Sequence, residues 1–161
     1  MKLTKGIRSI AVAIMAVLAL LLFVCLLAGV VLQQDSLAVA RANPGLAHMR
    51  VPVLLLGLCL LALFAAALVL AEFALGRILR DRIFTRASAQ LIRAMSWLFF
   101  CGLLPLVALF VYTAMNVSQS ITQLYVLFGA VALATAGLVL RLLANLVAEA
   151  SLYKQEVDLT V

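Results

Sequence analysis

The chain has 161 residues, of which 68% are hydrophobic and only 11% are charged, and its formal net charge at pH 7 is +6. So apolar a composition excludes a separate soluble domain, and we treat residues 1–161 as a single membrane domain. In a soluble protein the positive charge would favour nucleic acid as a partner. Here the basic flanks of membrane helices explain it, so we expect no direct nucleic-acid binding.

Long uncharged runs separated by polar junctions predict four transmembrane helices. A hydrocarbon core of about 30 Å is crossed by about 20 helical residues, so the run from Ala94 to Leu140 contains two crossings joined by a turn. The first run is too long for the core of a cleaved signal peptide and is expected to stay as a helix. The predicted fold is an all-α integral membrane protein, an antiparallel bundle of four transmembrane helices. The expected helices span residues 9–34, 51–75, 86–115 and 121–152.

Basic residues alternate between the junctions. An outer loop, residues 33–50, carries only Arg41 and Arg50, and the turn between the third and fourth helices carries no Lys or Arg. A basic inner loop, residues 76–93, carries five arginines. Because the cytoplasmic flanks of membrane helices are enriched in Lys and Arg, both termini are expected in the cytoplasm, with residues 153–161 as a cytoplasmic tail.

Apolar and aromatic residues accompany these charges at the expected inner surface. Arginines beside Ile83 and Phe84 suit anionic headgroups and acyl chains, so the lipid bilayer is an expected partner of the inner loop. Thr85 has the side chain of a helix N-cap and is expected to begin the third helix. Trp97 then falls at the inner end of that helix, where aromatic rings favour the interface.

Glu72 is the only acidic residue in the part of a predicted helix that is expected to cross the membrane, since Glu149 belongs to the continuation of the fourth helix past it. It follows Pro52 by about 20 residues, or roughly 30 Å, and is therefore expected at the inner boundary, where a carboxylate can reach water. Arg141 should reach nearly the same depth on the fourth helix. Two interpretations stay open: the two side chains pair across the second and fourth helices, or each reaches the interface independently.

No residue pattern predicts catalysis, a cofactor or a metal. The single histidine, His48, has no Cys, Asp or Glu cluster around it in the sequence. Cys25, Cys59 and Cys101 lie in apolar runs and are expected to pack as small hydrophobic side chains. We therefore expect a non-enzymatic protein without cofactor or metal.

The fourth helix carries two further patterns. Small residues such as Gly129, Ala134 and Gly137 predict a close approach to another helix, either of this chain or of a second copy, so a homo-oligomer stays open. Arg141 and Glu149 then belong to a polar stripe on a helix that continues past the membrane. This continuation either follows the membrane surface or binds a cytoplasmic protein.

Two regions, Phe84–Arg93 and Arg141–Val161, form the expected cytoplasmic face. Both lie on the side of the membrane to which the basic residues assign the termini. The candidate contact residues are Phe84, Arg86, Arg93, Glu149, Tyr153, Glu156 and Asp158.

Two segments resemble the bacterial family called domain of unknown function 2975. Ile78–Arg86 is similar to the family's stretch that ends in Phe and a small capping residue, and Glu149–Val161 is similar to its acidic ending with Asp-Leu-Thr and a β-branched last residue. Arg82 and Val157 depart from the pattern, because glycine and asparagine are common there. The resemblance implies a four-helix membrane protein of about this length with no established activity. Members are often encoded beside a Cro-type helix-turn-helix regulator, which the resemblance implies as a partner.

The expected function is that of a small bacterial integral protein of the plasma (inner) membrane, multi-pass, which acts through protein contacts at its cytoplasmic face. The alternative is a subunit of a small transporter or channel, in which Glu72 and Arg141 would line a solvated path between helices.

Overall fold

The computed structural model describes residues 5–80, 85–117 and 121–159, and the side chains of residues 5, 7 and 154–159 are outside the described part. The described residues form four long α-helices and one short 3₁₀ helix. Each long helix contains a stretch apolar enough to cross a membrane, with mean hydropathies from 2.2 to 3.3, which confirms the prediction of four helices of that length and composition. In chain order the elements are α1 (Lys5–Ala42), η1 (Pro44–Met49), α2 (Arg50–Leu79), α3 (Arg86–Asn116) and α4 (Ile121–Leu159).

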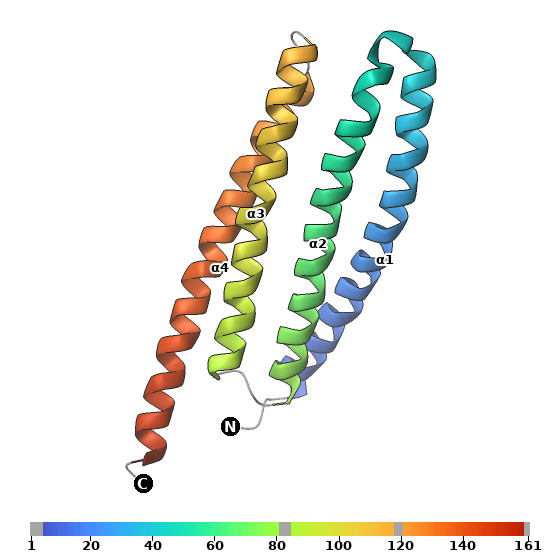
Figure 1. Cartoon of the computed structure of the whole chain (residues 1–161). Coiled ribbons are helices and arrows are strands. Elements are labelled where there is room, and N and C mark those ends of the chain that lie inside the picture. Colours follow the sequence, from blue (N-terminus) through green and yellow to red (C-terminus); the bar gives the residue numbers. More distant parts are fainter. Residues whose placement is uncertain (1–4, 81–84, 118–120, 160–161) are drawn as a thin grey trace.

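The four helices lie side by side in an open row, in the order α1, α2, α3, α4 (Figure 1). Among the described residues, Cα atoms approach within 8 Å only between helices that follow one another in the chain, and α1 does not meet α4. The helices are antiparallel, as predicted, but the bundle is not closed. These helices are apolar on most of their circumference, so they have no single apolar face that must be buried in a common core. An open row of helices is therefore compatible with their sequences.

The row has two ends, which we name by the chain segments found there. At the terminal end α1 begins and α4 ends, and at the hairpin end α1 is joined to α2 and α3 to α4 (Figure 1). Every second helix therefore runs in the same direction, and α2 and α4 both run toward the terminal end.

The helices are longer than the expected spans. The outer loop predicted for residues 33–50 is largely helical, because α1 continues to Ala42 and only Asn43 separates it from η1. Gln33–Arg41 contains neither Gly nor Pro, so nothing stops the helix before Asn43 and Pro44. At the other terminus α4 has 39 residues and a length of about 58 Å, well beyond a hydrocarbon core of about 30 Å.

Small residues allow the helices of each hairpin to approach closely. Between α1 and α2, a Cβ on Gly57 would lie 3.0 Å from Leu32 Cδ2. Between α3 and α4, a Cβ on Gly137 would lie 3.2 Å from the Phe100 ring. The hydroxyl of Ser96, which is fully buried, donates to the Gly137 carbonyl oxygen at 2.9 Å. The small-residue prediction for the fourth helix is thus confirmed, and the neighbour is α3 of the same chain.

Apolar side chains cover most of the outer surface. In the most apolar stretch of each helix only 11–22% of the residues are buried. Leu104 and Met115, for example, are 74% and 80% exposed. Exposed apolar area on this scale is expected for helices that lipid chains surround.

Candidate functional site

The arginines gather at the terminal end of the row. Two others, Arg41 and Arg50, lie at the hairpin end, where the Arg50 Nε donates to Ser36 Oγ at 3.4 Å. The uneven distribution of basic residues that the sequence shows is therefore also a difference between the two ends of the row. The described arginines toward the terminal end are Arg8, Arg77, Arg80, Arg86, Arg93 and Arg141.

Arg141 packs on an aromatic side chain. Its guanidinium carbon lies 5.5 Å from the ring centroid of Trp97, across the interface of α3 and α4. Trp97 also meets Phe100 edge-on, with 6.3 Å between centroids and an interplanar angle of 72°. Trp97 is 57% exposed and Arg141 is half-buried, so the guanidinium group lies over the ring at the surface of the α3–α4 interface.

Glu72 and Arg141, the candidate ion pair, do not meet. A Cβ on Gly102 would lie 3.9 Å from Leu60 of α2 and 3.4 Å from Leu133 of α4, so these three residues mark one level of the row. Glu72 lies 12 residues beyond Leu60, about 18 Å, whereas Arg141 lies 8 residues beyond Leu133, about 12 Å.

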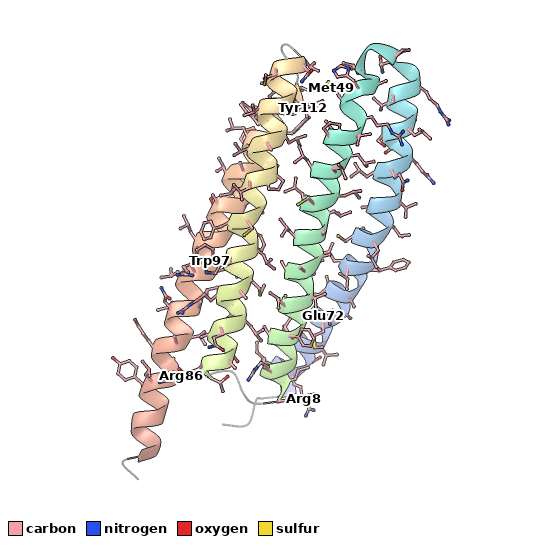
Figure 2. All side chains as sticks on the ribbon, viewed as in Figure 1. Arg8, Met49, Glu72, Arg86, Trp97 and Tyr112 are labelled. Atoms are coloured by element: carbon pink, nitrogen blue, oxygen red, sulfur yellow. The ribbon has the colours of Figure 1, made fainter. Side chains whose placement is uncertain are left out.

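The two residues are also separated laterally. The Cα atoms of α2 and α4 stay more than 8 Å apart throughout the described residues. Figure 2 shows Glu72 on the side of α2 where α1 passes and Trp97 on the side of α4. Of the two interpretations that the sequence left open, this geometry favours independent side chains, because α3 stands between the two helices and its Trp97 contacts the arginine.

Glu72 lines a cavity at the terminal end. The cavity has a volume of about 660 Å³ and is bounded by α1, α2 and the start of α3. Glu72 Oε1 and Arg77 Nε are both buried and have no hydrogen-bond partner. Arg77 and Arg80 line the same cavity. The sequence pointed to these two arginines as determinants of orientation and as contacts of anionic headgroups, and the structure adds them to the surroundings of Glu72.

A second polar groove lies between the start of α3 and the end of α4. Thr85 caps α3 as predicted, and its hydroxyl oxygen accepts from the Ser88 backbone N–H at 3.3 Å. Arg86 and Arg93 follow on α3, and Ser151 of α4 is 2% exposed at the groove. The groove has a volume of about 250 Å³ and is lined by Arg86, Ala89, Gln90, Arg93, Ala148, Ser151 and Leu152.

The end of α4 projects from the row. Arg86 precedes Gly102 by 16 residues and Glu149 follows Leu133 by 16, so Arg86 and Glu149 lie at one level. Ten further residues of α4 extend about 15 Å past this level. Of the candidate contact residues, Arg86, Arg93, Glu149 and Tyr153 are exposed here. Phe84 lies outside the described residues, as do the side chains of Glu156 and Asp158.

At the hairpin end His48 joins the two hairpins. Its Nε2 lies 3.3 Å from Asn116 Oδ1, a hydrogen bond between η1 and the last residue of α3. The His48 side chain is exposed as well as hydrogen-bonded. Within the described part of the chain, no group of three His, Cys, Asp or Glu side chains is placed to hold a metal ion.

A family model described as "Protein of unknown function (DUF2975)" matches residues 36–161. The chain belongs to this family. No curated protein and no solved structure matches the chain.

The DUF2975 match includes all of α2, α3 and α4. These helices and Arg80, the C-cap of α2, contribute every charged residue of the cavity beside Glu72 and all of the groove between α3 and α4. Most of α1, which ends at Ala42, precedes the match. Glu72, Arg77, Arg141 and the projecting end of α4 therefore all fall within the family's part of the chain.

Proposed function

We propose that this DUF2975 protein is a non-enzymatic, multi-pass protein of the bacterial plasma (inner) membrane that has both termini in the cytoplasm and acts by binding a cytoplasmic protein. The arginines support the orientation, because six of those described lie toward the terminal end and two at the hairpin end. The exposed apolar surface of all four helices supports membrane insertion.

The single observation that carries the proposed protein contact is the projecting end of α4. The helix extends about 15 Å past the level of Arg86, where α3 begins, and although Ser151 is buried beside α3, this end of α4 also has exposed side chains. Leu152 and Tyr153 are 47% and 70% exposed on this end. An exposed apolar and aromatic face on a helix is a common recognition element for a partner protein.

The partner that we propose is a Cro-type helix-turn-helix regulator, on the strength of the family resemblance. Holding such a regulator at the membrane would keep it away from its operator, without any chemistry in the membrane protein itself. The proposal assigns the recognition surface to Leu152, Tyr153 and the residues that follow them.

The test uses the purified full chain in lipid nanodiscs and a purified Cro-type regulator from the same genome. Binding is measured by biolayer interferometry, for the intact chain, for a chain that ends at Leu152, and for Leu46→Ala at the hairpin end as a matched control. We expect the shortened chain to lose at least tenfold in affinity and the control to lose nothing. Equal binding by the shortened chain, or no binding by the intact chain, would contradict the proposal.

The alternative function, a subunit of a small transporter or channel, required Glu72 and Arg141 to line one path. The two residues belong to different helix interfaces, and Arg141 is held by Trp97. This arrangement therefore does not favour a transport path that is lined by both Glu72 and Arg141.

A further inference from the structure

The cavity beside Glu72 combines an apolar part with a charged rim. Its volume of about 660 Å³ is within the range of small-molecule sites, which is about 300–1,000 Å³. Three charged side chains, those of Glu72 and Arg77 on α2 and of its C-cap Arg80, line the cavity. The apolar lining comes from three helices and consists of Met15, Leu22, Val69, Phe73 and Leu91.

Glu72 and Arg77, two charged side chains that line this cavity, are half-buried, and each has one atom that the protein leaves without a partner. Glu72 Oε1 and Arg77 Nε have no hydrogen-bond partner, although both atoms are buried. Buried polar atoms almost always have a partner, and the cost of leaving one unpaired is greatest for charged groups. A carboxylate accepts hydrogen bonds only, and a guanidinium donates only. A ligand that satisfies both must therefore carry a donor for Glu72 and an acceptor, preferably anionic, for Arg77.

The order of these groups along α2 specifies the ligand further. Glu72 lies about 30 Å from Pro52, at the boundary of the hydrocarbon core of the membrane in which we place the protein. Arg77 and Arg80 follow about 7.5 and 12 Å later, at the depth of the headgroups. Toward the membrane surface, the charged lining of the cavity therefore presents first an acceptor and then two cations, and apolar residues such as Val69 and Phe73 flank the acceptor along α2.

Phospholipids present their groups in a fixed order with depth. Between the acyl chains and the phosphate a diacyl phospholipid has two ester carbonyls, which are acceptors and would face the Glu72 carboxylate unfavourably. A lysophospholipid has one acyl chain, and the hydroxyl freed by the missing chain lies at this depth as a donor. Its phosphate follows toward the surface, where arginine is well suited to bind it.

We propose that the cavity binds a lysophospholipid from the leaflet at the terminal end. The single acyl chain packs against the apolar lining of α1, α2 and α3, the free glycerol hydroxyl donates to Glu72, and the phosphate accepts from Arg77 and Arg80. This inference rests on the proposed membrane location but is independent of the proposed protein partner.

The first experiment compares ligands on the unaltered full chain, so that no variant has to fold. Native mass spectrometry of the protein in maltoside detergent measures retention of oleoyl lysophosphatidic acid, of its analogue without the free hydroxyl, of diacyl phosphatidic acid and of inorganic phosphate. We expect one lysophosphatidic acid per chain and about tenfold or more weaker binding of the deoxy analogue, the worth of a hydrogen bond to a charged group. Equal binding of the two, tighter binding of the diacyl lipid, or equal binding of inorganic phosphate would overturn the proposal.

The second experiment assigns the contacts. Glu72→Gln should remove most of the preference for the hydroxyl-bearing ligand, because a neutral amide oxygen accepts more weakly, and Arg77→Gln should weaken both ligands alike. Arg141→Gln is the matched control, since it removes one arginine near the same depth but outside the cavity, and it should leave binding unchanged. Retention of the full hydroxyl preference in Glu72→Gln, or an Arg141→Gln effect as large as that of Arg77→Gln, would contradict the assignment.

Discussion

The guanidinium carbon of Arg141 on α4 lies 5.5 Å from the centre of the Trp97 ring on α3. This contact joins a charged residue of one helix to the single tryptophan of the chain, and the edge of Phe100 supports the same ring. A cation over an indole face is favourable by about 0.5–2 kcal/mol, more where water is excluded. The contact therefore helps to set the register of α3 against α4 near the terminal end.

A double-mutant cycle measures this contact. Arg141→Gln and Trp97→Leu should each destabilise the fold, and the double variant should lose less than the sum of the two, with a coupling energy of about 0.5–2 kcal/mol. Unfolding in mixed detergent micelles, followed by far-UV circular dichroism, provides the free energies. The same cycle between Glu72→Gln and Trp97→Leu is the control and should show no coupling. A coupling near zero for Arg141 and Trp97 would show that the two side chains act independently.

Exchanging the charges of Glu72 and Arg141 should not restore stability. Glu72→Arg and Arg141→Glu each place a charge in an unsuitable environment, and the two sites share no contact, so their effects should add to within about 0.5 kcal/mol. The yield of folded protein in detergent, measured by size-exclusion chromatography, tests this for the two single variants and the double variant. A double variant that folds better than either single variant would mean that the two residues interact.

Glycine-to-alanine changes should have opposite signs at two positions. At Gly137 an added Cβ would lie 3.2 Å from Phe100, whose ring Trp97 also contacts, so overpacking should cost about 1–3 kcal/mol. At Gly76 an added Cβ meets nothing within 4 Å, so the better helix propensity of alanine should stabilise α2 by up to about 1 kcal/mol. Detergent-induced unfolding of both variants checks the prediction. Equal effects would show that the α3–α4 interface adapts to the extra methyl group.

Single cysteines should report the orientation in the membrane. In a cysteine-free background, Ala47→Cys in η1 should react with a membrane-impermeant maleimide added to intact spheroplasts. Tyr153→Cys on the projecting end of α4 should react only after the membrane is opened, because the proposed topology keeps the arginine-rich end in the cytoplasm. Both residues are exposed, so reactivity depends on sidedness alone. The reverse pattern would invert the proposed topology.

Apolar runs and local signals in the sequence predicted the helices well. Four helices follow from runs long enough to cross a bilayer, and the Thr85 cap was recognisable from its side chain at the start of an apolar pattern. The small residues of the fourth helix, among them Gly137, predicted a close approach that the structure places against Phe100 of α3. These features are local or need only the length of one helix.

Helix ends and lateral neighbours were harder to predict. Hydropathy marks where a membrane would end, whereas α1 ends where Asn43 and Pro44 interrupt the helix, two turns after the apolar run. Counting residues from the start of each helix placed Glu72 and Arg141 at similar depths. Such a count contains no information on which helices are adjacent. The connection between the third and fourth helices contained a better signal for a neighbour of Arg141. Trp97 lies 19 residues before the end of α3 at Asn116, and Arg141 lies 20 residues after the start of α4 at Ile121, so the two residues are at nearly the same level in this hairpin.

The open row has a consequence for how the protein is assembled. Since the Cα atoms of each of the four long helices come within 8 Å only of the long helices before and after it in the chain, each of these interfaces can form as soon as its second helix has been made. Such an order keeps the sequence separation between contacting residues small, a property associated with rapid folding. No late step has to bring α1 back to α4, so the α1–α2 hairpin can be complete in the membrane while α3 and α4 are still being synthesised.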